Sequence, residues 1–184
     1  MADAKRALPF LNPSSSADET APVFTVGNND APVVRGWHPL LTLTYVVEEG
    51  GMMVLVRERD LQGMTFEDVH NVAMANLRER ATIRTEPYGD ATLVILDNRY
   101  EASLLLIDEL WDETLPRQVP GEIVVAAPTH NVLAFTSAAS RTGLADLKNL
   151  VRRHHRPGSD HLLLPHFFVR RSRDWDVFEP VGQA

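Results

Sequence analysis

Residues 41–59 read LTLTYVVEEGGMMVLVRER and carry the strongest β pattern in the chain. Apolar and polar residues alternate through 41–48, the period of two that is typical of a half-buried strand. Gly50-Gly51 then supplies a two-residue loop, because glycine adopts the positive φ that tight hairpin turns require. The pattern predicts an antiparallel hairpin in which Val47 faces Val54 and Tyr45 faces Val56.

Three helices are predicted from apolar residues at every third or fourth position. The first begins after Thr65, an N-cap residue followed by Glu67 and Asp68, and ends near Arg80. The second covers about 100–112. The third covers about 142–155, where Pro157-Gly158 ends it.

The other apolar runs predict strands in pairs, at 83–85, 92–96, 122–127, 132–136, 162–170 and 176–178. Residues 122–127 and 132–136 are apolar almost throughout, as in central strands covered on both faces. We therefore expect an α+β fold. It would be a two-layer sandwich, with a mainly antiparallel sheet of hairpins and three helices on one face, in the order ββα-ββα-ββα-ββ.

The domain prediction follows from where the apolar period begins. Residues 1–22 contain Pro9, Pro13 and three consecutive serines but no period, so we expect a flexible tail there. Residues 23–184 are expected to form a single α+β domain, opening with a short edge strand at 23–26. The sheet face away from the helices would need cover, which favours a protein partner or a homodimer.

Composition narrows the classes of function. The net charge of -7 argues against nucleic acid as a partner, because such binding depends on a basic surface. The chain has no cysteine, which removes thiolate chemistry and disulfides. No apolar run is long enough for a membrane span or a secretory signal, so we expect a soluble cytoplasmic protein that does not bind a membrane.

Three stretches occur in order: DNRYEASLLLIDELWDE at 97–113, VPGEIVVAAPTHNVLAFTSA at 119–138 and GLADLKNLV at 143–151. Together they resemble the YtpQ-like family of uncharacterised bacterial proteins, from about residue 83 to residue 151. The resemblance implies a bacterial, cytoplasmic protein but supplies no established catalytic residues. Members of that family usually have more chain before this region. The resemblance draws attention to Asp97, Tyr100 and Glu101.

Those three residues are the candidate functional group. Paired carboxylates can bind Mg²⁺ or divide the roles of general acid and base. Asp97 and Glu101 also lie at a predicted helix start, where carboxylates commonly accept hydrogen bonds from free backbone N–H groups. Both interpretations remain open on the sequence.

Four histidines near the C-terminus are candidate metal ligands, but their spacing is unfavourable. His154, His155, His161 and His166 lie close in the sequence, but adjacent histidines on a helix point about 100° apart. We therefore expect a solvated basic helix end, with no metal ligands and no cofactor.

Arginines near the C-terminus form a second candidate site. Packing of the third helix beside the last strands would place five of them in one patch for an anion or an acidic partner: Arg152, Arg153, Arg156, Arg170 and Arg171. The alternative is that they are ordinary solvated cations paired with acidic residues.

The nucleotide-binding and nucleophile motifs are missing from the sequence: it has neither a G-x-G-x-x-G nor a Walker pattern, and no G-x-S-x-G. The preferred hypothesis is therefore a protein-interaction or regulatory module without catalytic activity. The alternative is a metal-assisted hydrolase or transferase that uses the Asp97/Tyr100/Glu101 region.

Overall fold

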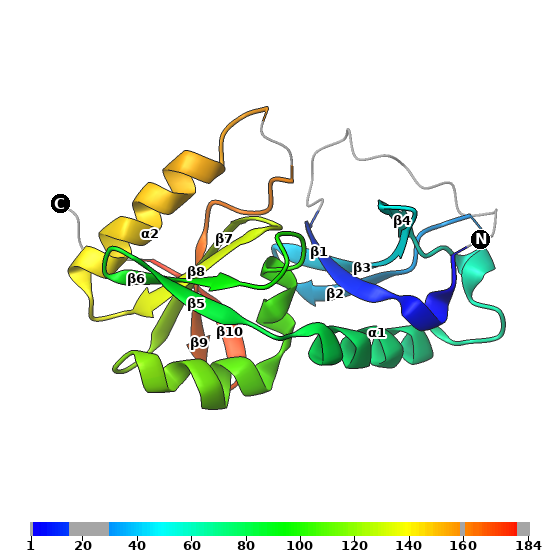
Figure 1. The fold of residues 1–184 in the computed structure, drawn as a ribbon, viewed down its shortest axis with the longest axis horizontal. Coiled ribbons are helices and arrows are strands. Elements are labelled where there is room, and N and C mark those ends of the chain that lie inside the picture. The colour runs from blue at the N-terminus through cyan, green and yellow to red at the C-terminus, as the bar shows by residue number, and fades with distance from the viewer. Residues whose placement is uncertain (1, 15–29, 159–160, 180–184) are drawn as a thin grey trace. The chain divides into compact units, whose positions relative to one another are not determined.

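The computed structural model describes residues 2–14, 30–158 and 161–179. It is an α+β protein with antiparallel sheets, and the chain divides into two compact units, Met1–Ala81 and Thr82–Ala184 (Figure 1). This organisation differs from the single domain over 23–184 that the sequence led us to expect. In the described part of the chain, no helix is long and apolar enough to cross a membrane.

The first unit contains a four-stranded sheet and one long helix (Figure 1). Its elements are η1 (Ala4–Arg6), β1 (Leu8–Pro13), β2 (Val34–His38), β3 (Leu41–Glu49), β4 (Met52–Leu55), η2 (Glu58–Asp60) and α1 (Phe66–Arg80). Strand β3 pairs with all three other strands, β1 on one edge and β2 and β4 on the other.

The hairpin register predicted from 41–59 is confirmed. Val47 faces Val54 in β4, and the N–H of Val56 donates to the carbonyl of Tyr45 at 2.8 Å. The N-cap of α1 is confirmed as well, because Thr65 Oγ1 accepts from the N–H of Asp68 at 3.1 Å.

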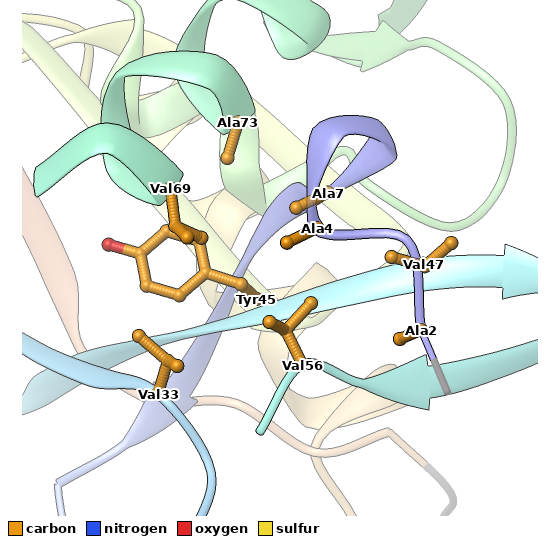
Figure 2. Packing of buried hydrophobic residues seen from close by; sticks show 9 residues of the cluster. All are labelled: Ala2, Ala4, Ala7, Val33, Tyr45, Val47, Val56, Val69 and Ala73. Atoms are coloured by element: carbon orange, nitrogen blue, oxygen red, sulfur yellow. The ribbon is translucent and has the colours of Figure 1, made fainter. Parts of the chain in front are cut away.

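The core of the first unit lies between β3 and α1. Tyr45 and Val47 alternate onto the side of β3 that faces Val69 and Ala73 of α1. Figure 2 shows the cluster with its strand and helix residues pointing toward one another: Ala2, Ala4, Ala7, Val33, Tyr45, Val47, Val56, Val69 and Ala73.

The predicted tail is wrong for residues 2–14. Residues 8–13 pair with β3 over its first six positions, and Leu11 is fully buried. Asp60 anchors this segment, since its buried carboxylate accepts from the N–H of Ala2 at 3.1 Å and of Arg57 at 3.0 Å. Pro9 and Pro13 are tolerated because β1 is an edge strand of the sheet that the described residues form. The rest of the predicted tail, and the strand predicted at 23–26, lie outside the described residues.

The second unit contains a six-stranded antiparallel sheet in the order β10-β9-β7-β8-β6-β5. Its elements are β5 (Arg84–Tyr88), β6 (Ala91–Ile95), η3 (Ala102–Leu106), η4 (Leu110–Thr114), η5 (Leu115–Gln118), β7 (Ile123–Thr129), β8 (Val132–Ser137), α2 (Arg141–His154), β9 (Phe167–Arg171) and β10 (Asp174–Phe178). The apolar strands β7 and β8 occupy the centre, which confirms the expectation for 122–136.

This sheet is covered on both faces, so the predicted single helical layer is not found in the second unit. Leu147 and Leu150 of α2 pack on Ala134 and its neighbours on one face. On the other face, Trp111 of η4 meets the ring of Phe135 edge-on at 6.1 Å. Ala134 and Phe135 are consecutive strand residues and therefore point to opposite faces. Figure 1 shows α2 and the η3–η5 segment on opposite sides of the strands.

The α-helix predicted over 100–112 is also wrong. The chain instead forms the 3-10 turn η3 and the π-helical turn η4. One cause is visible at Leu104, whose carbonyl accepts from the N–H of Ile107 at 3.1 Å and from Trp111 Nε1 at 2.7 Å. In an α-helix, the carbonyl of Leu104 would accept from the N–H of residue 108. The indole of Trp111 donates to this carbonyl instead, so tertiary packing competes with the helical hydrogen bond.

Candidate functional site

The turn that follows β6 is organised by the carboxylate of Glu101. Its Oε1 accepts three backbone N–H groups, from Leu96 and Asp97 at 3.1 Å each and from Asn98 at 2.7 Å. Asn98 has a φ of 69°, a left-handed conformation that asparagine adopts more readily than most residues. The chain therefore reverses tightly around one carboxylate oxygen.

Asp97 plays a similar local role. Its Oδ1 accepts from the N–H of Arg99 at 3.1 Å and of Tyr100 at 3.2 Å. The two carboxylates thus accept N–H groups of the turn over 96–100, whereas the 3-10 turn η3 that follows has no hydrogen bond from a side chain at its N-cap.

The second carboxylate oxygen of Glu101 is in a different situation. Glu101 is only 1% exposed, and its Oε2 is buried without a hydrogen-bond partner among the described residues. The following residue is fixed to the β7–β8 turn, because the N–H of Ala102 donates to the carbonyl of His130 at 3.0 Å. The carboxylate is therefore held in one place with one acceptor unused.

Glu101 lines a cavity of about 440 Å³ that lies wholly within the second unit. The polar residues of the wall are Arg84, Asp97, Asn98, Glu101, Asn131 and His154, and the others are Tyr88, Leu93, Val94, Ile95, Leu96, Val132, Leu133 and Leu150. The wall is therefore mainly apolar, with a small number of polar groups.

Three elements position this wall. Hairpin β5–β6 pairs Arg84 with Ile95, which places Arg84 beside the start of the Glu101 turn. Helix α2 contributes Leu150 and His154 from its C-terminal half. Its N-terminal half is fixed to the same hairpin, because Asp146 Oδ2 accepts from the N–H of Asp90 at 2.8 Å.

Two of the three predicted residues, Asp97 and Glu101, reach the cavity. Tyr100 is fully buried and is not among the lining residues. No local pattern in the sequence connects Arg84, Asn131 or His154 with Glu101, because the order of the strands decides which residues share a cavity. His154 is the one member of the histidine group in the wall, and the described part of the chain has no group of three His, Cys, Asp or Glu residues arranged to hold a metal ion.

The structure does not gather the five arginines into one patch. Arg170 is buried on the face of the sheet opposite α2, where Nε and Nη2 donate to Asp112 at 3.0 Å each and Nη2 donates to Asp108 at 2.7 Å. Arg171 forms an exposed pair with Glu122 at 2.8 Å. The other three, Arg152, Arg153 and Arg156, are exposed at the C-terminal end of α2.

Strand alternation explains this separation, since Arg170 and Arg171 are consecutive in β9 and point to opposite faces.

Comparison of the chain with protein-family models, curated proteins and solved structures finds no match.

Proposed function

We propose that this protein is a non-catalytic regulatory module that binds a small molecule in the cavity of its second unit. One observation carries the proposal: the second unit contains a cavity of about 440 Å³ whose wall is mainly apolar and includes a small number of polar groups. Ligand sites typically measure about 300–1,000 Å³ and combine apolar walls with a few polar groups. The cavity has both properties.

The hydrogen bonds of the wall favour binding over catalysis. Glu101 Oε1 and Asp97 Oδ1 hold the turn together through backbone N–H groups. A general acid or base must exchange its proton with a substrate, and these two oxygens are engaged in keeping the turn folded. The carboxylates therefore support a preformed pocket.

A ligand screen tests this proposal. Thermal unfolding would be measured with a panel of amines, carboxylic acids, nucleosides and the ions Mg²⁺ and Mn²⁺. A ligand at one hundred times its Kd stabilises a protein by about 2.7 kcal/mol, which shifts the midpoint measurably. We expect at least one class of organic compound to raise the midpoint. A shift with Mg²⁺ or Mn²⁺ that Glu101→Gln abolishes would instead support the metal-assisted hydrolase or transferase.

A matched pair of variants locates the binding. Val132→Trp puts a bulky ring into the cavity wall and should abolish the shift. Val177→Trp makes the same change at an exposed position of β10 that does not line the cavity, and should leave the shift intact. An equal response from both variants would contradict the cavity as the site.

A second observation favours self-association through the first unit. Val34, Met53 and Leu55 are 44%, 36% and 39% exposed. They pair with Thr44, Glu48 and Val46 of β3, so all three lie on the sheet face opposite α1. Apolar groups on one sheet face suit a second copy of the chain.

Sedimentation would test the homodimer. We expect a dimer at micromolar concentration that Leu55→Glu dissociates, whereas Phe66→Glu, at an apolar residue 50% exposed at the start of α1, leaves it unchanged. A monomer for the unmodified chain at every concentration would refute self-association.

A further inference from the structure

We propose that the ligand of this cavity is a small organic acid in its anionic form, an apolar body carrying a carboxylate that binds between Arg84 and His154. The inference rests on the proposed ligand site and names the chemical class of its ligand. Arg84 and His154 are the two residues of the wall that can carry a positive charge, and both are exposed.

Strand register places Arg84 on the side of the sheet that α2 covers. Arg84 pairs with Ile95 of β6, and the side chains of a directly opposed pair lie on one face of the sheet. Ile95 is two residues from Leu93, which packs against the core cluster of α2, and alternate strand residues share a face. Tyr88, further along β5 on the same face as Arg84, packs against that cluster as well. Arg84 therefore reaches the cavity from the strand β5.

Helical periodicity places His154 opposite Arg84, on the stripe of α2 that faces the strands. Leu147 is fully buried against the sheet, and His154 follows it by about two helical turns. Leu150 lies between them on this stripe and also lines the cavity. Arg153 is turned about 100° away from His154 and is not part of the wall. His154 therefore reaches the cavity from the last turn of α2.

The acidic residues of the wall are bonded to the chain itself. Glu101 is 1% exposed, and its Oε1 accepts from three backbone N–H groups. Asp97 Oδ1 accepts from the N–H groups of Arg99 and Tyr100. These hydrogen bonds compensate part of the negative charge, so the carboxylates oppose a bound anion less than their number indicates.

The exposed residues of the wall all carry N–H donors. They are Arg84, Asn98 and His154, whereas the rest of the wall is buried or half-buried. A guanidinium has five N–H groups and no acceptor, and an imidazole has at least one N–H in either protonation state. A carboxylate complements such donors, and its hydrogen bonds to ionised donors are about twice as strong as neutral ones.

The ion pair of Arg84 leaves this role open. Arg84 Nε lies 3.5 Å from Glu86 Oε1 on the same strand, and the two side chains are 72% and 54% exposed. Exposed ion pairs contribute little to stability, so the guanidinium can turn toward a bound carboxylate at small cost. Its planar fork suits bidentate binding of that group.

The apolar residues of the wall suit the body of the ligand. Leu93, Ile95, Val132 and Leu150 line the cavity, and Tyr88 contributes an aromatic ring. A cavity of about 440 Å³ holds a compact organic molecule. The combination therefore favours an acid with an apolar body over an inorganic anion.

Three probes with the same ring test the head group: benzoate, benzyl alcohol and benzylammonium. Titration calorimetry and ligand-observed NMR would be run on the full chain. We expect benzoate to bind at least about tenfold more tightly than benzyl alcohol, with benzylammonium weakest. This comparison uses the unmodified protein and therefore does not depend on the folding of any variant.

Two substitutions then test the donors. Arg84→Met and His154→Leu remove them at exposed positions, and circular dichroism would verify that each variant is folded. We expect each variant to bind benzoate at least about fivefold more weakly and benzyl alcohol as before. Arg153→Met is the control, because it removes an exposed cation beside His154 that is not part of the wall. It should change the affinity for benzoate by less than about twofold.

The outcomes separate this inference from the proposed function. Preferential binding of benzylammonium, or no preference among the three probes, would overturn the anionic ligand and leave the cavity as a ligand site. Benzoate affinity retained in Arg84→Met or in His154→Leu would also overturn it. An equal loss in Arg153→Met would do the same, because the attraction would then come from the basic helix end as a whole. If no compound of the broader panel bound in the cavity, both proposals would fail.

Discussion

Arg170 is a buried cation of the second unit with several partners. Its side chain is 6% exposed, it bonds Asp112 and Asp108, and its guanidinium lies 5.2 Å from the centre of the Trp175 ring. The hydrogen bond from Arg170 lowers the pKa of Asp112 below its ordinary 3.8. Arg170 therefore connects β9, β10 and η4 on the face away from α2.

Replacing Arg170 by methionine should lower the free energy of unfolding by about 2 kcal/mol, because hydrogen bonds to charged groups contribute about 1.5–3 kcal/mol. Arg171→Met is the matched control on the same strand. The side chains of Arg171 and its partner Glu122 are each 48% exposed, so the loss of this pair should cost less free energy of unfolding than the loss of Arg170. Urea denaturation of both variants gives the comparison, and equal losses would contradict a structural role for Arg170.

His70 makes the stability of the first unit depend on pH. Nδ1 of His70 lies 3.0 Å from the hydroxyl of Tyr45, which is 1% exposed. Burial raises the pKa of Tyr45 to about 12, so the hydroxyl keeps its proton near neutral pH and shares a hydrogen bond with His70. Burial, together with the positive charge of Arg35, lowers the pKa of His70 below its ordinary 6.5.

A lowered histidine pKa means that the native state binds fewer protons than the unfolded state. The stabilisation is therefore complete above pH 6.5 and is lost as the pH falls through the native pKa. We expect the free energy of unfolding to drop as the pH falls below 6.5, and His70→Gln to flatten that dependence. An NMR titration of the His70 ring that gave a pKa above 6.5 would contradict this prediction.

At the residue scale, the sequence revealed the acidic group but not its geometry. Asp97 and Glu101 stand out because carboxylates at a turn can cap backbone N–H groups or bind a ligand or an ion. Deciding between these roles requires knowing which oxygens are engaged, and that depends on the conformation of Asn98 and on the position of the β7–β8 turn. Neither leaves a pattern in the sequence.

At the scale of elements, close approach of α2 to the sheet depends on Gly143. A methyl group there would lie 2.0 Å from Thr136 Oγ1 and 2.9 Å from the carbonyl oxygen of Asp90. Thr136 itself donates to that carbonyl at 3.2 Å, so it cannot move away without losing this bond. Glycine is therefore required by packing in the first turn of α2.

Gly143→Ala should destabilise the second unit by about 1–3 kcal/mol, the usual cost of overpacking, although alanine is the better helix former. Gly36→Ala is the control, since a methyl group at Gly36 meets nothing within 4 Å. Thermal unfolding monitored by circular dichroism would show the difference. A stabilised Gly143→Ala would mean that α2 packs farther from β8 than described.

Elements with a strict local period were predictable, and elements fixed by tertiary packing were not. Strands β3 and β4 and helix α1 follow from alternation, a glycine pair and a capping threonine. All five residues of η3, Ala102–Leu106, are buried. This part of the segment 102–118 therefore lacks the polar face by which a helical period is recognised. Its backbone follows the bond from Trp111 to Leu104, which is a tertiary contact.

At the scale of the whole molecule, the division into two units could not be predicted from the sequence. Apolar spacing identifies strands but does not say which strands share a sheet. The sheet of the first unit is completed by β1, which lies in the proline-containing segment assigned to a tail. Because β1 pairs with β3, the core between β3 and α1 is formed entirely by residues of Met1–Ala81. The second unit starts at Thr82.

This division predicts that Thr82–Ala184 folds by itself. Its six strands, α2 and both covering layers all come from its own residues, including the contact of Trp111 with Trp175 at 5.2 Å. We expect the fragment to unfold cooperatively, and Gly143→Ala to destabilise it by the same amount as in the full chain. Dispersed amide NMR signals and a Trp111–Trp175 contact would support independence. A fragment that unfolds without cooperativity would show that the second core needs residues of the first unit.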